Sequence, residues 1–321
     1  MNGRRGQGDC KLAESEPTEV AHALAGKGLW IDFGAGTVRV QSDSRVLAAQ
    51  LQVAYEQFPL VGEASWADMH VQILRPLGAR RWIRPQIRFQ CDGRLPFDAF
   101  PADSPLPLFE WGCNWLIGQR FNDLLLLHAG AVERDGLALV LPATPGSGKS
   151  TLTAALSQRG WRLLSDEFGA FDHDSGTFRA VLKPIALKNQ SIGVIRRFSP
   201  RAVFGPEFPK TRKGTVAHLA ATQEAVVRRH ESASPGAFVL PKWVAGSPTR
   251  FQPMAENVLF SALAFNAFNY NLLGAIGFKA VVRLVRECPA WQLVYSDLDD
   301  ALAAIDTVWP QVIERQAAAK S

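Results

Sequence analysis

One short segment constrains the fold of this chain more than any other, the heptapeptide Pro145-Gly-Ser-Gly-Lys-Ser-Thr151. It stands between an apolar run, Leu137–Leu141, and a helix-like segment, Thr151–Arg159. A strand, a glycine-rich turn and a helix in that order form the context of a P-loop, in which backbone N–H groups converge on phosphate oxygens. The alternative is a glycine-rich turn that precedes a helix by coincidence. The segment predicts a nucleoside triphosphate site.

The residue types of this loop fit a nucleotide together with its metal ion. Lys149 would reach the β- and γ-phosphates of ATP, and the hydroxyl of Ser150 would bind Mg²⁺. The complete pattern G-x-x-x-x-G-K-[ST] has glycine where this chain has Ala143, and alanine is tolerated there if its φ is negative. The predicted nucleotide-binding residues of the loop are Pro145, Gly146, Ser147, Gly148, Lys149, Ser150 and Thr151.

Two adjacent carboxylates, Asp166 and Glu167, follow Ser150 by sixteen and seventeen residues. A helix of about ten residues and a return strand, Trp161–Ser165, would bring them to the carboxyl end of the neighbouring strand, beside the loop. One could hold Mg²⁺ while the other accepts a proton from an attacking hydroxyl. Adjacent strand residues point to opposite faces, so the alternative is a solvated acidic pair of which at most one member faces the nucleotide.

Several basic side chains each have two open interpretations. His128 ends the strand before the loop strand, so it lines the active cleft or is a core histidine bonded to a backbone carbonyl. Lys213, in the segment Arg212–His218, closes over phosphates or belongs to an exposed basic turn. The same two interpretations apply to Lys183 and Lys188.

The composition narrows the class of protein. At 321 residues the chain can bury a large core, in one large domain or two modest ones. Its 35 basic and 30 acidic residues give a net charge of +5, and no dense basic run with interleaved aromatics occurs, which argues against nucleic-acid binding. Four widely spaced cysteines without metal-ligand spacing, and no apolar stretch after the basic N-terminus, are typical of a cytoplasmic protein with reduced thiols.

An apolar segment, residues 258–278, raises the question of a membrane helix. Ser261 and three asparagines interrupt it, and each polar group would need a partner in lipid. We therefore expect no membrane contact and a buried core helix over residues 255–274. On that helix Asn266 and Asn269 are spaced i, i+3 and are expected to form internal hydrogen bonds.

The chain divides into three parts. Residues 1–18 are polar and are expected to be disordered. Residues 19–104 are expected to form a small α+β unit that ends near the proline-rich segment Pro101–Pro107, and residues 105–321 an α/β domain with the P-loop core. The expected strands cover residues 28–33, 37–41, 69–74, 85–90, 124–128, 137–141, 161–165 and 237–240, the first two as a hairpin. Besides the two helices already described, helices are expected after residues 42–44, over 108–121 and after an N-cap within 295–300.

Three segments of this chain together resemble the catalytic core of the HPr kinase/phosphorylase group, and most closely the HPr kinase-related kinase A family. They are His128–Val132, Pro145–Thr151 and Arg159–Glu167. Later motifs of that family are similar to Thr211–His218, Asn266–Tyr270 and Tyr295–Asp300, so the resemblance covers about residues 105–300.

The resemblance implies an α/β fold related to phosphoenolpyruvate carboxykinase and a protein-serine kinase activity. It implies that Lys149 and Ser150 are the P-loop lysine and serine. It favours Asp166 as the base, with Glu167 on the metal, and it matches His128 to an active-site histidine. The related enzymes form hexamers, which leaves a homo-oligomer open here.

The chain also departs from the HPr kinase pattern. The family signature Ile-Glu-Ile-Arg-Gly-x-Gly corresponds to Ile185–Gly193, where Ala186 replaces the glutamate and Lys188 the arginine. Thr151 replaces the glutamate that follows the P-loop serine. One metal ligand is therefore lost, which argues against phosphorylase activity and against HPr as the substrate.

These observations predict an ATP- and Mg²⁺-dependent kinase whose acceptor is a serine or threonine hydroxyl of a protein or peptide. Lys213 or Lys188 would neutralise charge on the transferred group. Two alternatives remain: a kinase for a small alcohol, such as a sugar or nucleoside, and a non-catalytic protein that uses the nucleotide as a switch.

Overall fold

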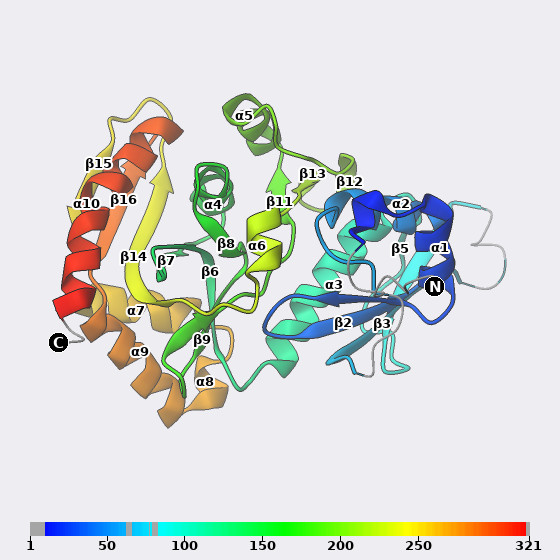
Figure 1. Cartoon of the computed structure of the whole chain (residues 1–321), viewed down its shortest axis with the longest axis horizontal. Coiled ribbons are helices and arrows are strands. Elements are labelled where there is room, and N and C mark those ends of the chain that lie inside the picture. Colours follow the sequence, from blue (N-terminus) through cyan, green and yellow to red (C-terminus); the bar gives the residue numbers. More distant parts are fainter. Residues whose placement is uncertain (1–9, 62–65, 77, 79–82, 319–321) are drawn as a thin grey trace, which may run out of the picture.

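The computed structural model describes residues 10–61, 66–76, 78 and 83–318. Within these residues the chain is a mixed α/β protein with three sheets, of five, eight and three strands. The five-stranded sheet lies toward the N-terminus, and Figure 1 shows the α3 helix between it and the larger sheet. The predicted α/β class is therefore confirmed.

The N-terminal sheet has the strand order β1-β2-β3-β4-β5. Its strands are β1 (Leu29–Asp32), β2 (Thr37–Gln41), β3 (Met69–Leu74), β4 (Gln86–Cys91) and β5 (Phe100–Pro101). The predicted hairpin is confirmed, since β1 and β2 pair antiparallel. The helix α2 (Arg45–Ala54) begins where predicted, because Ser44 Oγ accepts a hydrogen bond from the Leu47 N–H at 3.2 Å.

The described part of the expected disordered tail is folded. A 3-10 turn, η1 (Leu12–Glu14), precedes the helix α1 (Pro17–Ala25). Leu12 is buried, and its N–H donates to the Phe58 carbonyl at 2.8 Å. The polar composition misled the prediction for residues 10–18, because one buried leucine and a sequence-distant hydrogen bond hold this segment. Residues 1–9 lie outside the described residues.

The helix α3 (Pro105–Arg120) follows the proline-rich segment and packs against β3, β4 and β5 of the N-terminal sheet. It also carries Glu110, which is buried and lies 3.1 Å from the Nζ atom of Lys183, outside the N-terminal sheet. The N-terminal sheet and the rest of the chain therefore share a buried polar contact through this helix.

The central eight-stranded sheet has the order β10-β9-β6-β7-β14-β16-β15, with β8 paired to β6. The neighbours β7, β14 and β16 run parallel, and β6 and β15 pair antiparallel to this group. The strands are β6 (Leu125–Arg134), β7 (Leu137–Pro142), β8 (Arg162–Ser165), β9 (Phe168–Asp172), β10 (Thr177–Arg179), β14 (Ser234–Trp243), β15 (Arg250–Pro253) and β16 (Ala290–Tyr295). The carboxyl ends of three parallel strands thus meet at one edge of the sheet.

One predicted neighbour relation is wrong. The strand that leads to the acid pair, β8, does not pair with the loop strand β7, because β6 lies between them. Both β7 and β8 are antiparallel to β6, so they run in the same direction and end at the same edge of the sheet. The acid pair therefore still arrives beside the loop, one strand farther away than the sequence indicated.

Two groups of helices pack on the central sheet, and Figure 1 shows the sheet passing between them. The first group is α4 (Lys149–Ser157) and α10 (Leu298–Ala318), and the second is α7 (Glu256–Asn266), α8 (Tyr270–Leu273) and α9 (Ala275–Glu287). A three-stranded sheet of β11 (Ile185–Lys188), β13 (Gly214–Leu219) and β12 (Phe208–Thr211), with α5 (Gln190–Phe198), lies beside α4. The short helix α6 (Gln223–Val227) follows β13 and contacts β8.

The expected single buried helix over residues 255–274 is wrong, because the segment is broken into α7 and α8, and α9 begins directly after it. Asn269 lies at the break, where its side chain accepts from the Leu126 N–H at 3.0 Å and donates to the Leu124 carbonyl at 2.8 Å. Only Asn266 bonds within its helix, to the Ala262 carbonyl. Several apolar side chains here are exposed, Phe265 to 83%. No helix in the described ranges has the length and apolar character needed to cross a membrane.

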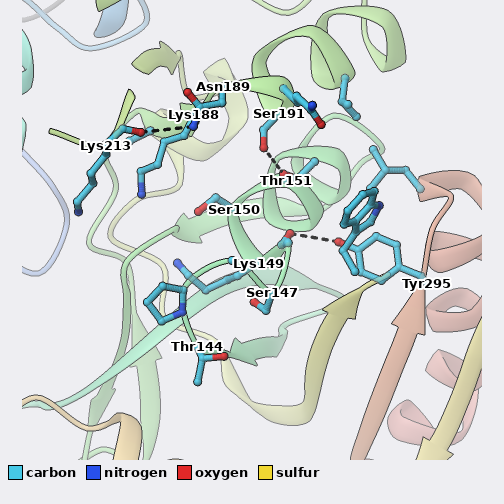
Figure 2. A pocket seen from close by; sticks show the side chains of 18 of the residues that line it. Thr144, Ser147, Lys149, Ser150, Thr151, Lys188, Asn189, Ser191, Lys213 and Tyr295 are labelled. Atoms are coloured by element: carbon cyan, nitrogen blue, oxygen red, sulfur yellow. Dashed lines mark hydrogen bonds between the residues drawn. The ribbon is translucent and has the colours of Figure 1, made fainter. Parts of the chain in front are cut away.

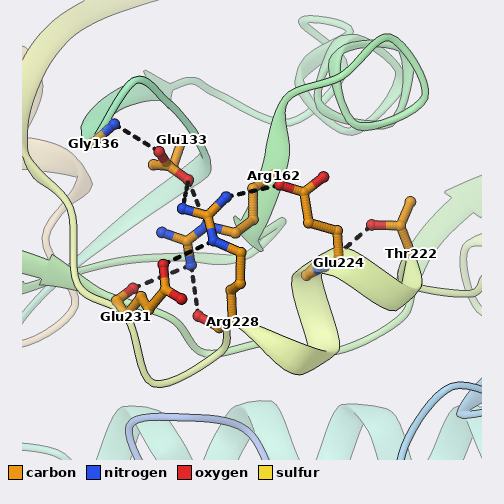
Figure 3. Close-up of polar contacts among 8 residues, drawn as sticks. Glu133, Gly136, Arg162, Thr222, Glu224, Arg228 and Glu231 are labelled. Atoms are coloured by element: carbon orange, nitrogen blue, oxygen red, sulfur yellow. Dashed lines mark hydrogen bonds and ion pairs between the residues drawn. The ribbon is translucent and has the colours of Figure 1, made fainter.

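A buried ion pair joins β6 to β8 on the central sheet (Figure 3). Glu133 Oε2 lies 2.5 Å from Arg162 Nε, and each residue is only 2% exposed. The same arginine donates to the carbonyls of Arg228 and Glu231, and the Gly136 N–H donates to Glu133 Oε1. Both charges thus have additional hydrogen bonds, which a buried pair needs in order to offset its desolvation.

Candidate functional site

A cavity of about 720 Å³ opens at the carboxyl edge of the parallel strands (Figure 2). Its size is within the range of small-molecule sites. The glycine-rich loop, residues 144–148, and the first turn of α4 form its floor, and side chains from several other elements complete the wall. These are His128, Glu167, Ala186, Lys188, Asn189, Gln190, Ser191, Val194, Lys213, Trp243, Tyr295, Ser296 and Leu298.

The backbone of the loop depends on its glycines. Gly146 and Gly148 have φ angles of 87° and 88°, a region that residues with side chains rarely adopt. Ala143 has a negative φ, which meets the condition for alanine at that position. The helix α4 starts at Lys149 with no side-chain cap, and the Ser147 hydroxyl is buried without a hydrogen-bond partner. Uncapped N–H groups, the helix dipole and an unpaired hydroxyl together suit an anionic ligand.

Lys149 and Asp166 are buried against each other behind the loop. Lys149 Nζ lies 3.4 Å from Asp166 Oδ1 and also donates to the Asp166 backbone carbonyl. Burial raises the pKa of Asp166, although the charge of Lys149 opposes this effect. Asp166 Oδ2 is buried without a partner, and the residue is not part of the cavity wall. The carboxylate therefore does not face the cavity directly, and Lys149 is its partner.

Glu167 faces the cavity and lies next to His128. The distance between His128 Nε2 and Glu167 Oε2 is 3.4 Å, and each side chain is about one quarter exposed, at 26% and 28%. Burial by itself would raise the pKa of Glu167, but the hydrogen bond from His128 and the charge of Lys149 hold this pKa well below its usual range. Of the two interpretations of His128, the structure favours the cleft over the core.

The three lysines of uncertain role separate into two groups. Lys188 and Lys213 line the cavity, whereas Lys183 is buried and pairs with Glu110 and Asn114. Burial lowers the pKa of Lys188, and the neighbouring Lys213 lowers it further. A bound phosphate would stabilise the two neighbouring cations Lys188 and Lys213, so this side of the cavity suits an anionic ligand. Lys183 has a structural role instead.

Several residues at the cavity were not predicted as site residues, among them Trp243, Tyr295 and Ser191. Trp243 and Tyr295 are the last residues of β14 and β16, and Ser191 Oγ lies 3.0 Å from the Thr151 hydroxyl of the loop. Trp243 follows an apolar run, as the loop itself does. The rule that ligands bind at the carboxyl ends of parallel strands would have found it, had the parallel neighbours been known.

The residues of the site fit Mg²⁺ only together with a nucleotide. No group of three or more His, Cys, Asp or Glu side chains that could hold a metal occurs in the described part of the chain. Mg²⁺ in phosphate sites commonly uses one or two carboxylates, with phosphates and waters as its other ligands. Ser150, Asp166 and Glu167 offer such a partial set, since Ser150 and Glu167 both line the cavity and Asp166 directly precedes Glu167.

Comparison of this chain with protein-family models and with curated proteins gives no match.

Proposed function

We propose that this chain is a kinase with a P-loop core of the HPr kinase/phosphoenolpyruvate carboxykinase type. It would transfer the γ-phosphate of ATP to a serine or threonine hydroxyl of a protein or peptide other than HPr. The observation that carries the proposal is the glycine-rich loop, which leads into the uncapped start of α4 with Lys149 and two carboxylates beside it. The motif resemblance described above supports the same activity.

The backbone N–H groups of residues 146–150 and the ammonium group of Lys149 would bind the phosphates. The buried, unpaired hydroxyl of Ser147 fits this role, since a phosphate oxygen would supply its missing partner. Lys188 and Lys213 would face the transferred group from the other wall. Bound Mg²⁺ would neutralise negative charge on the phosphates, and Ser150 with Glu167 would hold it.

In the transfer step the acceptor oxygen forms a bond to the γ-phosphorus, and the bond from that phosphorus to the β–γ bridging oxygen breaks. ADP leaves with the electron pair, and the acceptor proton passes to Asp166 and then to water. The opposite pKa shifts of the two neighbouring carboxylates support this assignment. The raised pKa makes Asp166 the better proton acceptor, and the lowered pKa keeps Glu167 charged for a metal.

The reverse assignment is favoured by a different observation. Glu167 is the carboxylate that lines the cavity, whereas Asp166 is buried and would share one Mg²⁺ with Ser150, as the serine and acid of many P-loop enzymes do. In that arrangement Glu167, oriented by His128, would accept the proton. Single variants at the two positions distinguish these assignments, as described below.

The function is tested with γ-¹⁸O-labelled ATP and Mg²⁺ added to a host-cell lysate and a peptide fraction, followed by mass spectrometry. We expect labelled phosphate on peptide serine or threonine with the wild-type protein and with Lys242→Ala, a control at an exposed lysine of β14. The label should be absent with Lys149→Ala. Label confined to small metabolites would identify a small-alcohol kinase instead. ATP binding without any labelled acceptor would favour a nucleotide switch.

A further inference from the structure

We propose that the indole ring of Trp243 forms a platform on which the nucleobase of the bound nucleotide stacks. Hydrogen bonds hold Trp243 and its neighbour Tyr295 against the glycine-rich loop. This inference rests on the proposed nucleotide function and adds the part of the site that recognises the base. We call Trp243 and Tyr295 the aromatic clasp.

The topology brings the clasp to the edge where a nucleotide would bind. The glycine-rich loop leaves the carboxyl end of β7, and β14 and β16 are the next two parallel strands. Trp243 ends β14 and Tyr295 ends β16, and the two residues are register partners. Ligands of such sheets bind outside the carboxyl ends of the strands.

Hydrogen bonds fix the clasp to the loop. The Trp243 N–H donates to the Ser147 carbonyl at 2.9 Å, and the Tyr295 hydroxyl donates to the Gly148 carbonyl at 3.2 Å. The indole N–H of Trp243 donates to the Ser296 carbonyl at 3.2 Å, which orients the ring. The clasp is therefore positioned before any ligand binds, which lowers the entropic cost of stacking on it.

The exposure of the tryptophan is unusual for a side chain held so firmly. Tyr295 is almost fully buried, whereas Trp243 is 47% exposed and lines the cavity. A fixed, half-exposed indole in a cavity is a suitable surface for a flat heteroaromatic group, because stacking on it needs no specific base. An adenine or guanine base would cover the exposed part of the ring.

The distribution of charged side chains around the cavity predicts how a bound nucleotide would be oriented. Figure 2 shows Lys188 and Lys213 on one side of the loop and Tyr295 on the other, with Ser147, Lys149 and Ser150 between them. The γ-phosphate would lie toward the lysines, and the base toward the clasp. The triphosphate would span the first turn of α4, where the uncapped N–H groups are.

The inference is tested by comparing MgATP with magnesium tripolyphosphate, which has the phosphates but no base, by isothermal titration calorimetry. Trp243→Leu keeps the backbone N–H and an apolar side chain but removes the ring. We expect it to weaken ATP binding by roughly 5- to 100-fold while tripolyphosphate affinity stays the same. Trp243→Phe should restore most of the ATP affinity, and Trp66→Leu, at a tryptophan that is 73% exposed, should change neither.

Each other outcome overturns a specific statement. Unchanged ATP affinity in Trp243→Leu would overturn the base platform. An equal loss of affinity for ATP and tripolyphosphate would also overturn it, because it would show that Trp243 only supports the loop. Tyr295→Phe is the reference for loop support, because it removes only the bond to Gly148 and should affect both ligands equally. If the wild-type protein binds tripolyphosphate as tightly as ATP, the platform is refuted while the phosphate site stands. If it binds neither, the proposed function itself fails.

Discussion

The ammonium group of Lys149 is 3.4 Å from a carboxylate oxygen of Asp166, and both side chains are buried, 9% and 4% exposed. The positive charge of Lys149 thus compensates the negative charge of the Asp166 carboxylate, and the loop contains no other cation that could do so. Phosphate oxygens would compete for the same ammonium group. Binding of a nucleotide would then draw Lys149 away and free Asp166, so the two proposed roles depend on each other.

Replacing this lysine is expected to abolish nucleotide binding. Lys149→Ala removes the one loop side chain that carries a positive charge, so the dissociation constants for ATP and tripolyphosphate should both rise more than tenfold. Calorimetry measures both, with Lys242→Ala as the matched loss of an exposed lysine. Equal affinities in Lys149→Ala and the wild type would refute the phosphate site.

Variants of the acid pair are expected to separate proton transfer from metal binding. With Asp166 as the base, Asp166→Asn should retain ATP binding and lose at least about 100-fold in transfer rate, a typical loss for a general base. Glu167→Gln should instead raise the Mg²⁺ concentration needed for half-maximal activity. Quenched assays of phosphate transfer over a range of Mg²⁺ concentrations measure the transfer rate and the half-maximal Mg²⁺ concentration. If Asp166→Asn changes the Mg²⁺ requirement and Glu167→Gln loses the transfer rate, the two roles are exchanged.

The transfer rate is expected to depend on pH through Asp166. Its pKa is raised by burial above the ordinary value of 3.8, so its charged, proton-accepting form is lost at a higher pH than for an exposed aspartate. The rate should therefore rise with pH through this raised pKa and then level off. A pH profile that is unchanged in a partly active Asp166→Glu variant would show that another group titrates.

The two glycines of the loop are expected to differ in their tolerance of alanine. Both have positive φ, but a Cβ at Gly148 would lie 2.5 Å from the Tyr295 hydroxyl oxygen, whereas a Cβ at Gly146 would meet nothing within 4 Å. Gly146→Ala should cost about 1 kcal/mol of stability, since only the backbone is strained, and Gly148→Ala clearly more. Thermal unfolding measures this difference. Adding Tyr295→Phe should recover part of the loss at Gly148 only, and equal recovery at both glycines would contradict the steric explanation.

Breaking the buried ion pair between Glu133 and Arg162 is expected to destabilise the central sheet. Arg162→Met removes the nearest cation from the buried glutamate, which keeps the Gly136 N–H and a 3.3 Å contact to Arg228, and losses of about 3–5 kcal/mol are typical for such changes. Arg196→Met, which breaks an exposed pair with Glu207, should cost less than about 1 kcal/mol. Urea unfolding compares the two, and similar losses would show that burial is not the decisive factor.

The stability of the protein is expected to fall in mildly acidic solution because of His218. Burial, partly offset by the charge of Glu110, lowers the pKa of this histidine from 6.5 to about 4 in the folded protein. The unfolded chain therefore binds more protons between these values, and stability decreases as the pH falls from 6.5 toward 4, by up to about 1.4 kcal/mol per pH unit. Urea unfolding at pH 7 and pH 5 should show a smaller decrease for His218→Gln. The exposed control His70→Gln should behave as the wild type.

Local sequence patterns predicted the elements around the site well. Strand Leu137–Pro142, the glycine-rich turn and α4 follow each other as the apolar run, the glycines and the helix formers of that segment indicate. The hairpin of β1 and β2 and the cap of α2 by Ser44 were also predictable. Each of these features depends on interactions between residues close together in the chain.

Patterns over longer distances were less reliable. No local pattern in residues 255–274 indicates where the helix breaks. The break exists because the side chain of Asn269 forms hydrogen bonds with the backbone of Leu124 and Leu126, at the start of β6. The buried Leu12 likewise depends on a hydrogen bond to Phe58, outside any local pattern. In both segments a partner more than forty residues away in the sequence decided the structure.

The sequence by itself determined which residues form the proposed phosphate site, because the glycine-rich loop, Lys149 and Ser150 lie within one turn and one helix end. Only the tertiary structure decided what surrounds them. It placed β6 between β7 and β8, separated Lys183 from Lys188 and Lys213, and brought Trp243 and Tyr295 against the loop. Strand order and the approach of distant side chains are set by the packing of the whole sheet, which no short segment of sequence specifies.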